Sequence, residues 1–87
     1  MEFKNYKPID GKLLKISSVL EDGKIKYFKL RGDFFIHPEE SIEQIENYLI
    51  GKDINKDFVL NFEEFLNENK IQVYGFKPQD LLDYFTN

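Results

Sequence analysis

The sequence predicts a small α+β domain, in which a small antiparallel β-sheet, built from a hairpin plus a short third strand, packs against about three helices. Three observations lead to this prediction. Two segments with alternating apolar residues flank an Asp-Gly pair, and three later segments carry apolar residues at helical spacing. The length of 87 residues suits one domain, which at this size buries only about 60 to 65% of the surface exposed by its unfolded chain. A deep active site is therefore not expected.

The hairpin is predicted over residues 12–31, because the segments 12–20 and 24–31 flank a favoured two-residue turn, Asp22-Gly23. With this turn, Leu20 pairs with Ile25 and Ser18 pairs with Tyr27. One face of the hairpin then holds Leu14, Ile16, Leu20, Ile25 and Tyr27, and the other holds Leu13, Val19, Phe28 and Leu30. A solvated sheet face is normally polar, so the second apolar set needs a cover, a partner, or a bulge near Tyr27-Phe28 that redirects it.

The third strand is predicted at Phe34-Phe35-Ile36, after a turn or bulge at Gly32. A helix is predicted next, over 38–50, with Pro38 at its first position and a stop at Gly51. Its apolar stripe consists of Ile42, Ile45 and Leu49. Its acidic residues, Glu39, Glu40, Glu43 and Glu46, are expected on the opposite, solvated face.

Two further helices complete the predicted domain. The helix at 57–68 carries Phe58, Phe62, Phe65 and Leu66 at helical spacing, with Asp57 or Asn55 as its cap. Residues 71–74 are expected to be extended, and Gly75 breaks the chain before a last helix at 78–85 that buries Leu81, Leu82 and Phe85. Residues 1–11 are polar and are expected to form a flexible N-terminal segment, so that the single domain spans 12–87.

Composition excludes several classes of function. The net charge is −4, and no basic stripe is present to neutralise the phosphates of a nucleic acid. No apolar run suits a membrane span or a signal peptide. We therefore expect a cytoplasmic location and no membrane as a partner. Because the chain has no Cys, it cannot form disulfides, thiolate metal sites or Cys nucleophiles.

Residues 53–64 partly match an EF-hand calcium loop. Asp53, Asn55, Asp57, Asn61 and Glu64 fall at the positions of oxygen ligands. The position that requires Gly for a sharp turn holds a Phe, however, and EF-hands normally occur in pairs. A polar connection with an ordinary helix cap is therefore the favoured interpretation, no metal site is predicted, and a calcium-binding module is retained as an alternative.

His37 is the only histidine, and Asp33, Glu39 and Glu40 are near enough in sequence to orient it for proton transfer. No convincing nucleophile accompanies it, because the serines lie in predicted strands or in the first helical turn. We therefore predict that this chain has no catalytic site of its own.

Several motifs together resemble the C-terminal accessory domain of lipoate-protein ligases, across residues 6–51. They are Lys7-Pro8, Gly11-Lys12-Leu13-Leu14, Asp22-Gly23-Lys24-Ile25, Gly32-Asp33-Phe34-Phe35, and a Pro-Glu-Glu helix that ends at Leu49-Ile50-Gly51. The segment Gly75-Phe76-Lys77-Pro78 is similar to the family's closing segment, whereas 53–69 shows no family signature. In some systems this domain is a separate short chain, and that format is the one that this sequence resembles.

The resemblance implies a fold related to that of the sulfur-transfer scaffold proteins. It also implies a non-catalytic accessory subunit of a two-chain ligase, needed for ATP-dependent activation of lipoate to lipoyl-adenylate before transfer to a lysine of a lipoyl domain. ATP, Mg²⁺ and lipoate would be bound by the catalytic partner subunit, and no cofactor by this chain alone. The lipoyl-domain acceptor proteins would be indirect partners. A generic protein-interaction domain is a further alternative.

The resemblance also implies site residues. Lys7 and Lys12 match family positions and are expected either to approach the partner's active site and hold phosphate charge, or simply to be solvated. Phe28 and Leu30, on the second apolar face, are expected to be covered by the partner. The remaining family-motif residues are Gly11, Gly32, Asp33, Phe34 and Phe35. Asp33 is expected to fix the turn through backbone N–H groups or to pair with a cation of the partner, and the two Phe rings to point to opposite faces.

Overall fold

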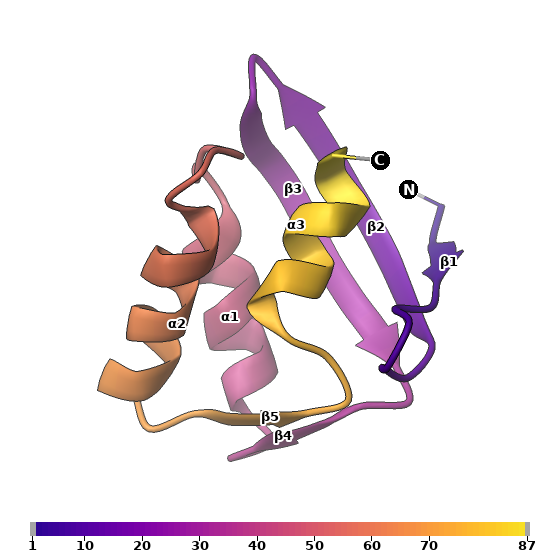
Figure 1. Ribbon diagram of the computed structural model, residues 1–87, viewed down its shortest axis with the longest axis vertical. Coiled ribbons are helices and arrows are strands. Elements are labelled where there is room, and N and C mark those ends of the chain that lie inside the picture. Colours follow the sequence, from indigo (N-terminus) through magenta and orange to yellow (C-terminus); the bar gives the residue numbers. More distant parts are fainter. Residues whose placement is uncertain (1, 87) are drawn as a thin grey trace.

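The computed structural model describes residues 2–86, and its two longest strands are the arms of the predicted hairpin (Figure 1). Strand β2 spans Leu14–Glu21 and strand β3 spans Lys24–Gly32. Both turn residues have positive φ, 55° at Asp22 and 76° at Gly23, as the predicted two-residue turn requires. The hairpin prediction is therefore confirmed at its tip.

A β-bulge changes the register beyond the tip. Leu20 pairs with Ile25 as predicted, but Val19 pairs with Tyr27 and Ser18 with Phe28, so Lys26 is the extra residue. The predicted pair of Ser18 with Tyr27 is wrong.

The bulge moves the later residues of β3 to the other face. Phe28 and Leu30, expected on an uncovered face, are fully buried on the same face as Leu14, Ile16 and Ile25. Their position in a regular hairpin is wrong, because one extra residue inverts the alternation of every side chain beyond it. Of the three explanations for the second apolar set, the bulge near Tyr27-Phe28 is the one that the structure shows. Conversely, Leu20, expected among the inward residues, is 41% exposed.

The third strand of this sheet comes from the N-terminus. Strand β1, Lys4–Tyr6, pairs antiparallel with β2 and gives the order β1-β2-β3. These residues belong to the segment that we expected to be flexible. The division of the chain into a flexible segment 1–11 and a domain 12–87 stays a prediction. The structure shows that residues 4–6 of the first segment pair with β2.

The strand predicted after Gly32 forms one residue later, in a different sheet. Strand β4, Phe35–His37, pairs antiparallel with β5, Gln72–Tyr74, in a two-stranded sheet. The prediction of a third hairpin-sheet strand here is wrong, because the chain turns away from β3 after Gly32. The extended conformation predicted for 71–74 is confirmed.

Three helices form in the predicted order. Helix α1 spans Ser41–Leu49, α2 spans Phe58–Glu68, and α3 spans Pro78–Thr86. Helix α1 begins three residues later than predicted, because Pro38 starts a tight turn in which its carbonyl oxygen accepts a hydrogen bond from the Ser41 N–H at 3.0 Å. In Figure 1 all three helices lie on one side of the sheet formed by β1, β2 and β3.

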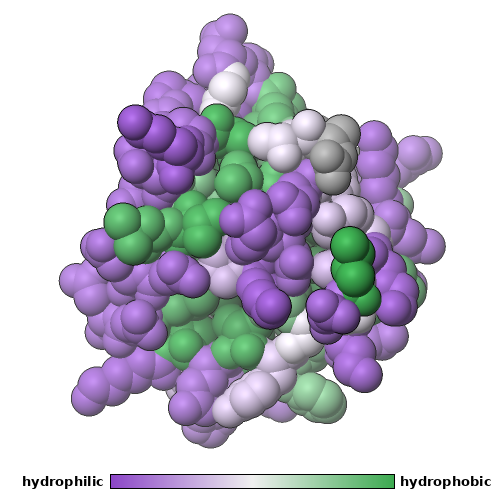
Figure 2. Space-filling view, in the orientation of Figure 1, coloured by the Kyte–Doolittle hydropathy of each residue, from purple (hydrophilic) through white to green (hydrophobic). Residues whose placement is uncertain are grey.

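The core lies between this sheet and the helices. It contains Leu14, Ile16, Ile25, Phe28, Leu30, Ile36, Ile45, Leu49, Phe58, Phe62, Leu66, Ile71, Phe76 and Leu81. Figure 2 shows that hydrophilic residues dominate the outline of the face seen in Figure 1, with hydrophobic residues gathered in patches among them. Within residues 2–86, no helix has the length and apolar character needed to cross a membrane.

Candidate functional site

His37 makes no ion pair with a carboxylate within residues 2–86. The imidazole is exposed on β4, where His37 pairs with Gln72 in the β4–β5 sheet. Across residues 2–86, no three His, Cys, Asp or Glu side chains gather closely enough to hold a metal ion.

Three glycines from distant parts of the sequence allow three backbone segments to touch at one end of the sheet. A Cβ atom on Gly11 would lie 2.8 Å from the carbonyl oxygen of Gly75, and one on Gly75 would lie 3.0 Å from Cβ of Phe34. A Cβ atom on Gly32 would overlap the carbonyl oxygen of Leu13. We call this region the glycine junction and define it as residues 11–13, 32–34 and 75.

Backbone hydrogen bonds hold the glycine junction together. The Lys12 N–H donates to the Gly75 carbonyl oxygen at 2.8 Å, and the Asp33 N–H donates to the Leu13 carbonyl oxygen at 3.0 Å. The structure thus unites the motifs Gly11-Lys12-Leu13 and Gly32-Asp33-Phe34 with the closing Gly75. At Asp33 the backbone N–H fixes the turn. The Asp33 carboxylate is exposed and makes no hydrogen bond within residues 2–86, so it does not fix the turn in the way expected for it.

The loop between β1 and β2 presents Lys7 and Lys12 beside the glycine junction. Both lysines are exposed, and neither forms an ion pair with any residue among 2–86. The loop is anchored by Pro8, which is buried and whose carbonyl oxygen accepts a hydrogen bond from the Gly11 N–H at 3.2 Å. The ammonium groups of Lys7 and Lys12 therefore project from an anchored loop. Their role towards a partner subunit stays a prediction.

A hollow of about 280 Å³ adjoins this loop and is lined by Tyr6, Lys7, Asp80 and Asp83 among others. Burial raises the pKa of Tyr6, and the negative charges of Asp83 and Asp80 raise it further. The phenol therefore stays protonated, and uncharged, at neutral pH. The electrostatic potential beside Lys7 therefore depends partly on the carboxylates of Asp80 and Asp83 in α3.

Large apolar side chains are exposed around the glycine junction. Ile9 is 97% exposed, Phe35 is 76% exposed, and Tyr74, which faces Phe35 across the β4–β5 pair, is 57% exposed. Phe34 points inward instead and packs edge-to-face on Phe76, with ring centroids 5.3 Å apart. The prediction that Phe34 and Phe35 point to opposite faces is confirmed, and Phe35 becomes a contact candidate.

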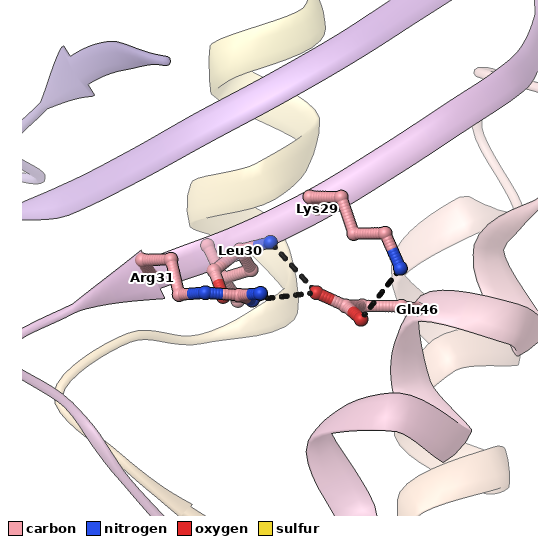
Figure 3. Close-up of polar contacts among 4 residues, drawn as sticks. All are labelled: Lys29, Leu30, Arg31 and Glu46. Atoms are coloured by element: carbon pink, nitrogen blue, oxygen red, sulfur yellow. Dashed lines mark hydrogen bonds and ion pairs between the residues drawn. The ribbon is translucent and has the colours of Figure 1, made fainter. Parts of the chain in front are cut away.

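Glu46 of α1 has a buried carboxylate that contacts the open edge of β3 (Figure 3). Its Oε2 accepts hydrogen bonds from the Leu30 N–H at 2.9 Å and from the Arg31 guanidinium at 3.2 Å, and its Oε1 lies 3.6 Å from the Lys29 ammonium. The expectation that Glu46 is solvated with its acidic neighbours is wrong. Position 46 lies four residues after Ile42, so it belongs to the inward side of the helix.

A groove of about 550 Å³ opens between β3, β4 and α1. Its lining includes Arg31, Phe34, Phe35, Ile42 and Glu46. The groove therefore joins the Glu46 contacts to the exposed ring of Phe35.

The segment matched to a calcium loop has other partners. Asp53 forms an ion pair with Lys24 at 2.7 Å, and the Asn55 side chain accepts a hydrogen bond from the Asp57 N–H at 2.9 Å. Helix α2 begins at Phe58, where the calcium loop needs positive φ, and Phe58 is absent from the positive-φ residues among 2–86. The favoured interpretation, a polar connection that leads into a helix, describes this segment.

Sequence reasoning missed three residues of these surfaces and misplaced two. Ile9, Tyr74 and Glu46 were not selected, although the i, i+4 relation of Ile42 and Glu46 was visible in the sequence. No local signal distinguishes Ile9 or Tyr74, since exposure depends on the surrounding fold. Phe28 and Leu30, expected to meet a partner, lie fully inside the core and present no side-chain surface.

Comparisons with known proteins agree on one family. A family model described as bacterial lipoate protein ligase C-terminus matches residues 1–85. The chain is 34% identical over 84 residues to lipoate-protein ligase A subunit 2 of Thermoplasma acidophilum, covering 94% of this chain and 84% of that protein. It is also similar to a solved chain from an archaeal lipoylation system of that organism, described as a bipartite lipoate protein ligase and its E2 lipoyl domain. The TM-score is 0.70 at 31% identity, over 95% of this chain and 91% of the other.

Proposed function

The chain belongs to the lipoate protein ligase C-terminal family, and we propose that it serves as the second subunit of a two-chain lipoate-protein ligase. The observation that carries this proposal is the match of nearly its whole length to a relative that is itself called subunit 2. The glycine junction supports it, because three of the motifs that carry the family resemblance, those at Gly11, Gly32 and Gly75, meet there in space.

We place its role in the first of the ligase's two steps. In lipoate activation, the lipoate carboxylate attacks the α-phosphorus of ATP and pyrophosphate leaves, which gives lipoyl-adenylate. In transfer, a lysine amine of a lipoyl domain attacks the acyl carbon and AMP leaves. Lipoate, ATP and Mg²⁺ would be held by the catalytic chain, and this chain would favour activation by completing that active site from outside.

The residues proposed for this contribution are Lys7 and Lys12. Their ammonium groups project from a loop anchored at Pro8 and at the glycine junction, so little ordering is required when the loop meets a partner. Positive charge brought to the phosphates would stabilise the charge that develops as pyrophosphate leaves.

The test is a reconstitution with the catalytic ligase chain of the same organism. Lipoate-dependent pyrophosphate release is measured with and without this chain, and transfer from preformed lipoyl-adenylate to a lipoyl domain is measured in parallel. We expect this chain to raise the rate of release by about tenfold or more, which corresponds to ~1.4 kcal/mol of transition-state stabilisation, and to leave transfer unchanged. An equal rate of release without this chain would refute the proposal.

Replacing Lys7 and Lys12 together by Ala tests the two residues. We expect pyrophosphate release to fall by about tenfold or more, because the loss of even one charged contact to phosphate costs ~1.5–3 kcal/mol. The matched control replaces Lys56 and Lys70, both exposed and located just before and just after α2, and should retain the full rate. Unchanged release in the Lys7/Lys12 variant would leave simple solvation as the role of these lysines.

The resemblance also supports two broader expectations. We propose that the fold is related to that of the sulfur-transfer scaffold proteins, and that the protein acts in the cytoplasm with lipoyl-domain proteins as indirect partners.

A further inference from the structure

The sheet β1-β2-β3 has a second face, opposite the helices. Figure 1 shows α1, α2 and α3 on one side of β2 and β3, and among residues 2–86 no helix covers the other side. Strand alternation places three cross-strand pairs there, because the residues between them fill the core. We call these pairs the outer face; they are Lys15 with Arg31, Ser17 with Lys29, and Val19 with Tyr27.

The outer face is basic, although the protein is acidic. Residues 1–31 carry eight Lys and Arg against four Asp and Glu, a net charge of +4. Residues 32–87 carry four against twelve, a net charge of −8. Lys15, Lys29 and Arg31 of the outer face belong to the basic part. Such a separation of sign gives the molecule one face that attracts anionic surfaces.

The cations of the outer face are not fully compensated within the chain. Glu46 is shared by Lys29 at 3.6 Å and Arg31 at 3.2 Å. Lys15 has no ion pair with any residue among 2–86, and it lies directly opposite Arg31 in the β2–β3 register. Like charges directly opposite each other destabilise a sheet. An acidic partner would relieve this repulsion.

The end of the outer face nearest the hairpin tip is less polar than the end at Lys15 and Arg31. Val19 and Tyr27 are half-buried neighbours, and the Ser17 hydroxyl is buried without a hydrogen-bond partner among residues 2–86. An apolar patch bordered by charged residues is common in protein–protein interfaces. This arrangement favours an acidic protein surface over the phosphates of a nucleic acid.

The outer face also continues into the glycine junction. The pair Leu14 with Gly32 ends the β2–β3 ladder, and the pair Lys15 with Arg31 is next to it. A protein that covers the outer face at this end therefore lies close to the loop with Lys7 and Lys12.

We propose that the outer face is the surface that docks on the catalytic ligase chain, through an acidic patch of that chain. The inference rests on the proposed function and adds to it which side of this subunit the catalytic chain covers. Docking there brings the glycine junction beside the catalytic chain and leaves the acidic helices in solvent.

The test measures the affinity of this chain for the catalytic ligase chain of the same organism, by titration calorimetry at low and at high salt. Lys15→Glu reverses one charge of the outer face, and Lys56→Glu makes the same change in the connection before α2. We expect Lys15→Glu to raise the Kd by about tenfold or more at low salt and by less at high salt. We expect Lys56→Glu to stay within about twofold of the wild type.

A folding defect is distinguishable from lost binding. Lys15→Glu replaces a like-charge pair with an opposite-charge pair opposite Arg31, so the isolated variant should melt at a temperature no lower than the wild type. A variant that is as stable as the wild type but binds more weakly supports docking through the outer face.

Other outcomes overturn the proposal. An unchanged Kd for Lys15→Glu, or an equal rise for both variants, would exclude the outer face as the docking surface while leaving the proposed function intact. A Lys15-dependent affinity for a lipoyl domain or an oligonucleotide, with normal binding of the catalytic chain, would assign the face to that other partner. If the wild-type chain does not bind the catalytic chain at all, both the inference and the proposed function fail.

Discussion

Gly32 shows how one residue type can be required by its surroundings. Its φ is 143°, a conformation that L side chains rarely adopt, and a Cβ atom there would overlap the Leu13 carbonyl oxygen. That oxygen accepts the hydrogen bond from the Asp33 N–H that turns the chain from β3 towards β4. A glycine at this position therefore allows the hairpin and the second sheet to share one corner.

Gly32→Ala should lower the free energy of unfolding by about 2 kcal/mol or more, because backbone strain and a clash with main-chain atoms add together. Gly51→Ala is the matched control: its φ of 89° is also positive, but no atom lies within 4 Å of an added Cβ. We expect the control to cost about 1 kcal/mol, from backbone strain alone. Urea unfolding of both variants checks this, and equal losses would show that the close approach to Leu13 is unimportant.

At the scale of elements, α1 is joined to β3 by a side chain rather than by apolar packing alone. Glu46 occupies the open edge of β3 and satisfies the Leu30 N–H, which has no partner strand on that side. A second contact of this edge lies near the hairpin tip, where the Ile25 N–H donates to the Lys52 carbonyl oxygen at 3.0 Å. The edge is thereby covered at two points.

Glu46→Ala should lower the free energy of unfolding by about 1–3 kcal/mol, because it leaves the buried Leu30 N–H without its acceptor. Glu43→Ala, at an exposed position one turn earlier in α1, should change the stability by no more than about 0.5 kcal/mol. Chemical denaturation at neutral pH compares the two variants. A Glu46 variant as stable as the Glu43 variant would contradict this account of the β3 edge.

The packing of α1 on α2 includes a titratable ring. Tyr48 stacks on Phe65 with ring centroids 4.0 Å apart, and Lys52 lies over the Tyr48 ring at 4.5 Å. Burial raises the pKa of Tyr48 above its usual 10.0, and the charges of Glu64 and Glu68 raise it further. The folded state thus holds the phenolic proton more tightly than the unfolded state does.

The contribution of Tyr48 to stability is therefore complete below pH 10 and is lost as the pH rises through the raised pKa of the folded state. Tyr48→Phe keeps the ring stacking and removes the phenol, so its stability should fall less steeply between pH 9 and about pH 11 than that of the wild type. Urea midpoints measured across this range compare the two proteins. Parallel pH profiles would show that the Tyr48 phenol does not titrate differently on folding.

At the scale of the whole molecule, charge and packing are divided between two layers. The sheet layer is basic and presents the outer face, whereas the helices are acidic and cover the core from the other side. The acidic residues that suggested a calcium loop belong to the helical layer. There Asp53 pairs with Lys24 across the fold rather than with its sequence neighbours.

Calcium should therefore leave the stability of the whole protein unchanged. A sensor-type site with a Kd of ~10 μM would raise the free energy of unfolding by about 2.7 kcal/mol at 1 mM calcium, since that concentration is 100 times the Kd. We expect no change in melting temperature on adding 1 mM calcium, with 1 mM magnesium as the control. A calcium-specific rise of several degrees would restore the calcium-binding alternative.

The sequence by itself determined the features that depend on neighbouring residues. The Asp22-Gly23 turn follows from the backbone angles that Gly and Asp tolerate, and the helices at 58–68 and 78–86 follow from apolar spacing and a Pro start. The order of the motif residues also carried the family resemblance. The meeting of three of these motifs in the glycine junction could not be predicted, because the contacts of Gly75 join residues that are more than 40 positions apart.

Only the tertiary structure decided which strands pair and which side chains are covered. The bulge at Lys26 brought Phe28 and Leu30 into the core, β1 rather than the segment after Gly32 completed the first sheet, and Glu46 was buried. Strand pairing depends on contacts between distant segments, and one inserted residue inverts every later side chain. Local patterns leave strand pairing and side-chain burial open, because the competing arrangements differ only in long-range packing. That packing determined which face of the sheet remained for a partner.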